Sequence, residues 1–482
     1  MMRRCILILM GFLCAGLLFA QLEPEQKSIH QREAELHASD VPNPAVEKAP
    51  ARPHALQKRS PNKLSRMVYG WYPYWMGTAY QSCDYDALSH IAYFSFDVDT
   101  ANGSYKTVNG WNTSQVIDYA HQRGVKVTLT IVNFGNVPNT KILSDTNKQN
   151  RLITDIIQML LLRNGDGVNI DFEAVPAAMR TNLVSFMRKL STRVKASFPN
   201  GEISMAAPAV DWSGAWDLAA LGQICDYLII MGYDYYWSGS TTAGPVAPLA
   251  GEYYNISNSV TTYLNAGVPA GKLLLGVPWY GYDWPVKDSS RKSTATGTAS
   301  SKTYVTAEPL AQAYGKIFDA TTKVPWYSYK SGTQWHQCWY DDSTSLALKS
   351  ALVNSKNLAG IGIWALGHEG GRKEIWNGLK ASFPLVSVFK NELAAEQFGL
   401  DQNFPNPFNP STEIGFFLNR TSNVRLEVFD VLGRSIAVLA NESMEPGYHR
   451  LIWNAARESG GVYFCRLTAA GSMRTIKMQL LR

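Results

Sequence analysis

The chain has 482 residues, of which 46% are hydrophobic, and a formal net charge of +6. This length exceeds that of one compact domain, so we expect two domains. The basic residues form no long runs, which argues against nucleic acid as a partner.

The first 20 residues, MMRRCILILMGFLCAGLLFA, join a basic start to an apolar stretch that is short for a membrane span. This pattern predicts a secretory signal peptide over residues 1–20, and no later segment is typical of a transmembrane helix. Residues 21–66 are rich in charge, proline and alanine and poor in aromatic residues. We expect a disordered linker there.

Short apolar runs alternate with amphipathic helical stretches over residues 67–385. Eight runs read as strands: RMVYGWY, HIAYFSF, VKVTLTIVNF, GVNIDFE, EISMAAPA, DYLIIMGYD, KLLLGVPWYG and GIGIWALG. This alternation predicts an α/β fold, a (β/α)8 TIM barrel. A doubly wound open sheet is less favoured, because no glycine-rich phosphate loop follows the first strand. An insertion at about 284–340 contains a polar part rich in Gly, Ser and Thr, which predicts a surface loop over one end of the barrel.

Residues 398–482 show a different pattern, in which short runs of alternating apolar and polar residues, typical of strands, are separated by turn residues. This region predicts a small immunoglobulin-like β-sandwich. The four cysteines beyond the signal peptide show no metal-ligand spacing, and no disulfide pairing follows from them.

The fourth predicted strand carries acidic side chains in a core run. Alternation places Asn169, Asp171 and Glu173 on one face, and Val168, Ile170 and Phe172 on the other. The apolar face would meet the helices, so the polar face would point into the barrel, toward the strand ends where catalytic groups collect. A structural ion-pair network is the alternative, but no Arg or Lys lies on this strand. Because a buried carboxylate is costly unless paired or used, we favour a functional role.

The segment DGVNIDFE resembles the signature of glycoside hydrolase family 18, the chitinase family, usually written DGxDxDxE; the likeness covers about residues 67–383. The resemblance implies that Glu173 is the catalytic acid/base, with Asp171 beside it, and that Asp166 is structural or part of the same network. Asn169 departs from the pattern, where the family usually has Asp. A subset of the family, which includes bacterial cell-wall and spore-cortex N-acetylglucosaminidases, shows a similar VNIDFE form.

Two further strands resemble family segments. DYLIIMGYD is similar to the MxYD motif, which implies that Tyr233 holds an acetamido group, with Met231 and Asp234 at the same strand end. GIGIWALG resembles the segment whose Trp, here Trp364, forms the floor beside the cleaved bond. Aromatic residues after other strands would lie around the same rim; these are Trp71, Tyr74, Trp75, Trp212, Trp279 and Tyr280. Some of them must belong to the core, but as a set they suggest a polysaccharide cleft.

Family 18 enzymes use the 2-acetamido oxygen of the substrate as the nucleophile, so the resemblance implies no protein nucleophile, metal or cofactor. Glu173 would protonate the leaving oxygen and then activate water, while Asp171 and Tyr233 would orient the acetamido group. Retention of all three residues favours an enzyme over a catalytically silent glycan-binding protein. A barrel that only displays the second domain would leave the buried carboxylates unexplained.

The last domain resembles the C-terminal sorting domain of type IX secretion substrates, through NFPNPFNPSTEIGFFL, VFDVLGR and GGVYFCRL. The resemblance implies the secretion machinery as a partner and a secreted or cell-surface location. An accessory module that binds glycan or spaces domains is the alternative. We therefore expect a secreted hydrolase of β-1,4-linked N-acetylglucosamine polymers, with chitin first and peptidoglycan second.

Overall fold

The computed structural model describes residues 27–40, 64–384, 398–418, 420–469 and 472–481. The predicted signal peptide lies outside these residues. The chain divides into two compact units, Met1–Leu385 and Val386–Arg482. Each unit has its own hydrophobic core.

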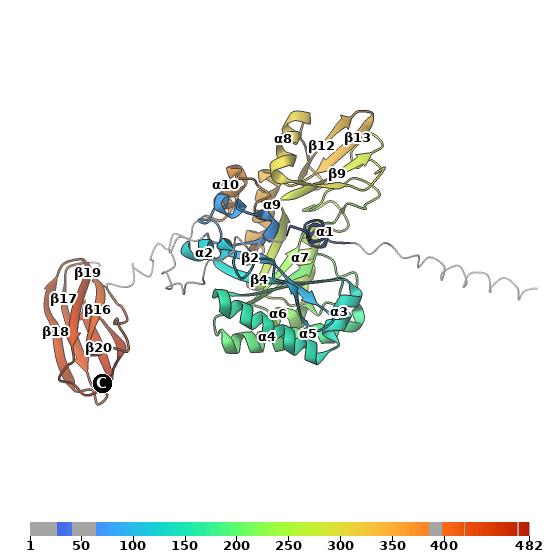
Figure 1. The fold of residues 1–482 in the computed structure, drawn as a ribbon. Helices are drawn as coiled ribbons and strands as arrows, with labels where there is room; N and C mark the ends of the chain where they lie inside the picture. The colour runs from blue at the N-terminus through green and yellow to red at the C-terminus, as the bar shows by residue number, and fades with distance from the viewer. Residues whose placement is uncertain (1–26, 41–63, 385–397, 419, 470–471, 482) are drawn as a thin grey trace, which may run out of the picture. The chain divides into compact units, whose positions relative to one another are not determined.

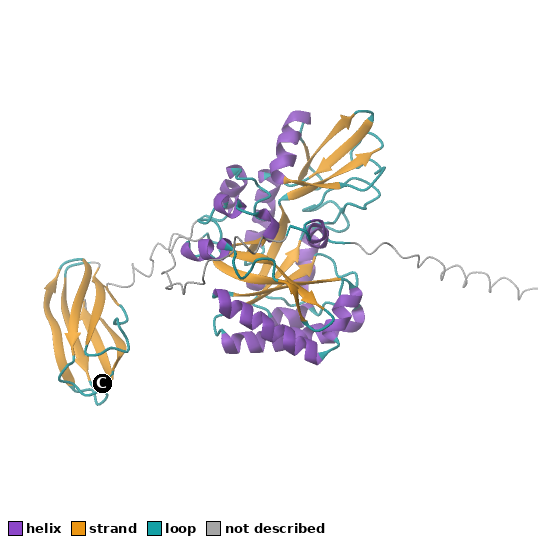
Figure 2. Cartoon of the chain, viewed as in Figure 1, coloured by secondary structure: helices purple, strands orange, loops and turns teal. Residues whose placement is uncertain are grey.

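Eight parallel strands close into a barrel in the first unit (Figures 1 and 2). They are β1 (Met67–Pro73), β2 (His90–Asp99), β4 (Lys126–Phe134), β5 (Gly167–Glu173), β6 (Glu202–Pro208), β7 (Tyr227–Met231), β8 (Leu273–Pro278) and β14 (Gly360–Trp364). Neighbours follow this order, and β14 pairs with β1 to close the ring. The short strand β3 (Ser104–Thr107) pairs in antiparallel orientation with the end of β2. The predicted TIM barrel is therefore confirmed.

Helices connect the strands and pack around them. They are α2 (Gln115–Gln122), α3 (Asn136–Leu143), α4 (Thr146–Arg163), α5 (Arg180–Ser197), α6 (Leu218–Ile224), α7 (Ile256–Asn265), α9 (Ser343–Ser355) and α10 (Lys373–Ser382). The helix α4 shows how local sequence sets the bounds. The Asp145 side chain accepts hydrogen bonds from two free backbone N–H groups at its start, and Asn164 ends it in the left-handed conformation.

The insertion forms more than the surface loop expected from its polar part. Its sheet has the order β10-β9-β13-β12-β11, in which all pairs are antiparallel. The strands are β9 (Tyr280–Val286), β10 (Ser300–Thr303), β11 (Ile317–Asp319), β12 (Val324–Ser331) and β13 (Gln334–Trp339), accompanied by α8 (Tyr304–Tyr314). In Figure 1 this sheet and α8 form a lobe beside the barrel.

The linker prediction is wrong for part of residues 21–66. Residues Ile29–Leu36 form the helix α1, with Ser28 as its N-cap. One side of this helix is buried: Ile29 and His30 have 1% and 0% of their surface exposed. Ile29 belongs to the hydrophobic core of the barrel unit, so the helix is packed against folded protein rather than solvated.

The second unit consists of two antiparallel sheets around one core, consistent with the predicted β-sandwich. Its strands are β15 (Phe398–Leu400), β16 (Ser411–Leu418), β17 (Ser422–Phe429), β18 (Ser435–Met444), β19 (Gly447–Asn454), β20 (Gly461–Ala469) and β21 (Ser472–Leu480). One sheet has the order β15-β16-β19 and the other β18-β17-β20-β21. Among the helices that the structure describes, none is long and apolar enough to cross a membrane.

Candidate active site

Strand β5 delivers two carboxyl groups to the barrel interior. Phe172 points outward and stacks on Phe186 of α5, with ring centroids 5.5 Å apart. Its neighbours Asp171 and Glu173 therefore share the inner face, as the alternation predicts. The Asp171 side chain is fully buried, whereas Glu173 at the strand end keeps 13% of its side chain exposed. Of these two carboxyl groups, Glu173 is therefore the one that reaches the cleft.

The end of β7 brings a phenol and a third carboxyl group to the same place. Tyr233 is 5% exposed and lies two residues after Met231, the last residue of the strand. Asp234 adopts a left-handed backbone with φ of 58°, a conformation that Asp tolerates better than most residues. Tyr280 donates a hydrogen bond to Asp234 and fixes its orientation. The residues predicted at this strand end, Tyr233 and Asp234, are thus both held in place beside the carboxyl groups of β5.

A cavity of about 770 Å³ opens beside these residues. Its lining includes Glu173, Met231, Tyr233, Asp234 and the 69% exposed Trp212. The size suits several sugar-sized groups, and a mainly apolar wall with a few polar groups is typical of a ligand cleft. Four residues of the predicted site and one rim aromatic are therefore brought to one cavity.

Burial sets the electrostatics of the carboxyl pair. Removal from water raises the pKa of Asp171 and that of Glu173, and the charge of Asp171 raises the pKa of Glu173 further. Two neighbouring buried carboxyl groups do not both ionise near neutral pH, so the pair keeps at least one proton. A raised pKa keeps one group available as a general acid.

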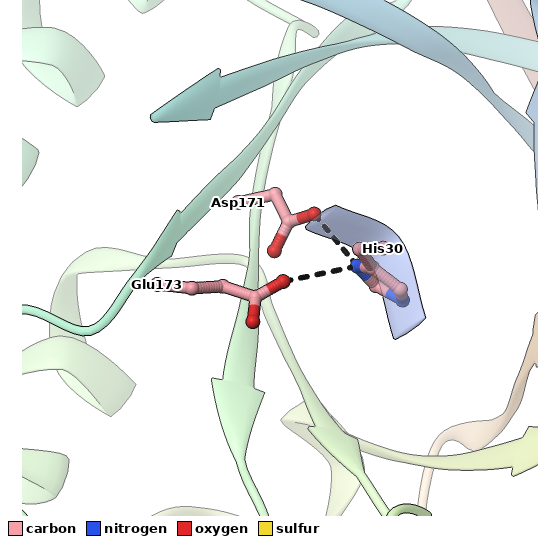
Figure 3. Close-up of side chains that lie close together, drawn as sticks. All are labelled: His30, Asp171 and Glu173. Atoms are coloured by element: carbon pink, nitrogen blue, oxygen red, sulfur yellow. Dashed lines mark hydrogen bonds and ion pairs between the residues drawn. The ribbon is translucent and has the colours of Figure 1, made fainter. Parts of the chain in front are cut away.

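The helix α1 places His30 directly against this pair. Figure 3 shows both carboxyl groups pointing toward the His30 ring. His30 Nδ1 lies 2.7 Å from Asp171 Oδ2 and 3.4 Å from Glu173 Oε1, while Nε2 lies 2.8 Å from the Tyr233 hydroxyl. Burial lowers the pKa of His30 to about 4, so its ring is neutral at pH 7.

The hydrogen-bond partners determine where the protons sit. When the pair is singly ionised, we assign its negative charge to Asp171, because Asp171 has the shorter contact with His30. An ionised carboxylate only accepts, so Nδ1 of His30 carries the proton and Nε2 accepts from Tyr233. The 2.7 Å contact is a direct hydrogen bond. It is shorter than the separation of about 3.3 Å between two ligands at the tetrahedral angle, each about 2.0 Å from a zinc ion, so a proton fits between these atoms better than such an ion.

Trp364 lies against one face of the His30 ring. The ring centroids are 3.7 Å apart with an interplanar angle of 26°, which is a stacked arrangement. The predicted floor residue therefore presents a flat face to the point where Asp171 and Tyr233 converge. Trp364 is fully buried, and His30 and Glu33 of α1 both contact it.

Asn169 and Trp71 lie beside the cluster in the barrel interior. Trp71 donates a hydrogen bond of 2.9 Å to Asn169 Oδ1, and Asn169 Nδ2 donates to Ser204. Both predicted residues are completely buried. Neither lines the cavity, so their contacts support the interior around Asp171 rather than the open part of the cleft.

Trp279 departs from its predicted place. Its ring packs edge-on against Trp376 of α10, with centroids 4.8 Å apart, and is fully buried. The next residue, Tyr280, faces the site instead, because alternation sends neighbouring side chains to opposite faces. The prediction of Trp279 as a sugar-binding residue is therefore wrong. Asp166 accepts from His121 and from the Val127 backbone, which supports its structural interpretation.

The sequence interpretation missed every contact made by α1. A local signal was present, because Ser28 followed three residues later by Gln31 matches a capping box. In the structure the Ser28 side chain accepts from the Gln31 backbone. That signal predicts a helix start but says nothing about what the helix binds.

Comparisons with known proteins identify relatives of the barrel unit. The model of glycosyl hydrolases family 18 matches residues 67–369. The cortical fragment-lytic enzyme of Bacillus anthracis is 29% identical over 297 residues, covering 58% of this chain and 65% of that protein. Di-N-acetylchitobiase of Rattus norvegicus is 26% identical over 287 residues, covering 53% of this chain and 74% of that protein. The chain thus spans slightly less than two thirds of the Bacillus anthracis relative.

A solved structure shows the same fold. The chitinase from Cycas revoluta, determined in complex with (GlcNAc)4, superposes with a TM-score of 0.60 at 18% identity and covers 66% of this chain and 99% of that one. The model of the secretion system C-terminal sorting domain matches residues 402–480. This match confirms the predicted sorting domain and the secreted or cell-surface location.

Proposed function

We propose, from the premise that the chain belongs to glycosyl hydrolases family 18, that it hydrolyses β-1,4-linked N-acetylglucosamine polymers, chitin or its oligosaccharides. The observation that carries the proposal is the convergence of Asp171, Glu173 and Tyr233 on one point above the face of Trp364. An acceptor, an acid and a hydroxyl donor around a flat aromatic face suit an N-acetylated sugar ring.

The proposed reaction needs no protein nucleophile. Glu173 gives its proton to the glycosidic oxygen, and the bond from that oxygen to the anomeric carbon breaks. The acetamido oxygen of the same sugar forms the new bond to that carbon. Asp171 accepts a hydrogen bond from the acetamido N–H, which becomes more acidic as positive charge develops, and Tyr233 orients the acetamido oxygen.

The second half of the reaction returns the site to its starting state. Glu173, now ionised, removes a proton from water, and the water oxygen attacks the anomeric carbon. The carbon–oxygen bond to the acetamido group breaks, so the product sugar recovers its acetamido group with net retention. The raised pKa of Glu173 favours its protonated form before each turnover.

Peptidoglycan is the second candidate substrate. The VNIDFE form with Asn169 is similar to that of a subset of the family that includes wall- and cortex-acting members, and one similar relative is a cortical fragment-lytic enzyme. N-acetylglucosamine also occurs in that polymer, so the same residues would act in the same roles. A glycan-binding protein without catalysis is the remaining alternative.

Product analysis by mass spectrometry tests the proposal. Two proteins are incubated with chitin oligomers and, separately, with purified peptidoglycan. They are the full chain and a variant lacking residues 27–40, the segment that contains α1 and contacts the site. Glu173→Gln should slow cleavage by about 10²- to 10⁴-fold, because it removes the general acid. Glu374→Gln on the surface of α10 is the matched control and should leave the rate unchanged.

Each result has a defined meaning. Release of N-acetylglucosamine oligomers from chitin that depends on Glu173 supports the first substrate, and cleavage of peptidoglycan alone supports the second. Cleavage by Glu173→Gln at the unaltered rate would contradict the assigned acid. Intact substrates in every sample would leave the binding protein as the better account.

A further inference from the structure

The helix α1 occupies the part of the site where the proposed reaction takes place. His30 is completely buried between Trp364 on one side and the polar groups of Asp171 and Tyr233 around its edge. A sugar ring stacked on Trp364 would need the same volume. Binding of α1 and binding of substrate at this point therefore exclude each other.

The His30 ring reproduces the hydrogen bonds of an acetamido group. Its Nδ1–H donates to Asp171 as the amide N–H would, and its Nε2 accepts from Tyr233 as the amide oxygen would. A neutral imidazole has one donor and one acceptor on opposite sides of a flat ring, which an amide also offers. The residue thus matches the proposed ligand group in polarity, planarity and neutral charge.

Other polar groups of α1 have partners on the barrel unit. Glu33 accepts a hydrogen bond of 3.0 Å from Trp364 Nε1, and the Ile29 backbone N–H donates to Asp234 Oδ2 at 3.1 Å. Arg32 donates to Tyr282 and to Ser238. These hydrogen bonds compensate for the loss of water around the buried polar atoms. A linker without a specific binding site would leave such buried atoms without hydrogen-bond partners.

The segment remains in contact with the rim beyond the helix. The ring of His37 stacks on Trp75 with centroids 4.9 Å apart and an interplanar angle of 10°. Tyr74 donates a hydrogen bond of 2.7 Å to the His37 carbonyl. Two predicted rim aromatics thus bind this segment where they were expected to bind sugar.

The outward side of α1 carries different chemistry. Leu36 is 73% exposed, and Glu35 pairs with Lys27 within the same segment. The residues that contact the site lie on the other side of the helix. The binding chemistry is therefore confined to the face that meets the catalytic groups.

We propose that residues 27–40 are an intramolecular inhibitor, a peptide ligand of the cleft that holds the chain in a latent state until it is displaced or removed. The inference rests on the proposed function, because it takes the site of α1 to be the site of the sugar. It predicts inhibition that is competitive with substrate.

Covalent attachment makes a weak peptide ligand effective. A tethered segment has an effective concentration on the order of 1 mM near its site. With an intrinsic Kd of about 10 µM, roughly 99% of the chains would be closed, and removal of the segment would raise kcat/KM by about 100-fold. Saturating substrate would displace the segment, so the apparent KM should change more than kcat.

Steady-state hydrolysis of soluble N-acetylglucosamine oligomers tests the inference. We compare the full chain, the variant lacking residues 27–40, His30→Ala and Glu35→Ala. The two substitutions in α1 form a matched pair, because His30 contacts the site and the side chain of Glu35 forms hydrogen bonds only within its own segment. The deletion and His30→Ala should raise kcat/KM by tenfold or more, and Glu35→Ala should not change it.

A synthetic peptide of residues 27–40 provides the reverse experiment. Added to the deletion variant, it should restore inhibition and raise the apparent KM without lowering kcat. Equal kcat/KM for the full chain, the deletion variant and His30→Ala would overturn the inference, even where Glu173-dependent cleavage supports the proposed function.

Binding measurements keep the two claims separable. If no form of the chain cleaves any oligomer, the proposed function fails, and the inference is judged by calorimetry on the deletion variant. Binding of the 27–40 peptide that N-acetylglucosamine oligomers compete away would support it. Absence of peptide binding, with the deletion variant shown to be folded by its circular dichroism, would overturn it.

Discussion

The role of the Tyr233 hydroxyl can be tested by removing a single oxygen atom from the site. The hydroxyl lies 2.8 Å from the group that occupies the proposed acetamido position, and its ring is buried. Its removal should leave the ring packing intact while deleting one donor to the atom that attacks the anomeric carbon. The residue therefore separates orientation of the acetamido group from proton transfer.

Tyr233→Phe should lower kcat by about 10²-fold with a smaller effect on KM, as loss of one preorganised donor does elsewhere. Steady-state kinetics of the variant lacking residues 27–40 measure this without competition from α1. Tyr263→Phe, which removes a buried hydroxyl that donates to the Pro208 carbonyl, is the control. Unchanged kcat in Tyr233→Phe would exclude the orienting role.

At the residue scale, much of the candidate site could be predicted from the sequence. Alternation along GVNIDFE placed Asp171 and Glu173 on the inner face, because period two is a geometric property of any strand. Trp279 could not be placed in this way, since the preceding strand ends at Pro278 and either neighbour could have faced the site. Only the contact with Trp376 decides it.

At the scale of elements, the helix α1 and the β12–β13 hairpin were not predicted from the sequence. The helix α1 spans eight residues, a length that is marginal in isolation, so its stability comes from partners distant in sequence. The charge-rich composition of this segment therefore predicts disorder when the sequence is considered alone. The β12–β13 hairpin did have a local signal: alternating aromatic residues flank a short turn in which Gly332 has φ of 61°, suited to glycine.

Docking of α1 should depend on pH through Glu33. Burial raises the pKa of Glu33 to about 8 in the docked state, with smaller effects of Trp364, Asp234 and Arg32. The free segment has an ordinary pKa near 4.5, so docking takes up a proton between these values. The contribution is fully present below pH 4.5 and is lost as the pH rises through about 8.

The affinity of the 27–40 peptide for the deletion variant checks this sign. Between pH 5 and 8 the affinity of the native peptide should fall relative to that of a Glu33→Gln peptide, by at most tenfold per pH unit. The comparison cancels the titration of His30, which both peptides carry, and of Asp171, Glu173 and Asp234, which both peptides contact. A constant affinity ratio across this range would show that Glu33 is ionised in the docked state.

At the scale of the whole molecule, two units carry two tasks. The barrel unit holds every described residue of the candidate site, and the second unit carries the sorting domain. The family match over residues 67–369 lies within the first unit and the sorting match over 402–480 lies within the second. Catalysis and export can therefore be studied on separate parts of the sequence.

The most direct test of the central claim is the anomeric form of the first product. Proton NMR spectra are recorded during the earliest minutes of hydrolysis of a soluble N-acetylglucosamine oligomer, by the full chain and by the variant lacking residues 27–40. Attack by the acetamido group followed by water gives two inversions, so the β-anomer should appear first and convert slowly to the equilibrium mixture. Initial release of the α-anomer would mean direct attack by water, and would contradict the roles proposed for Asp171, Glu173 and Tyr233.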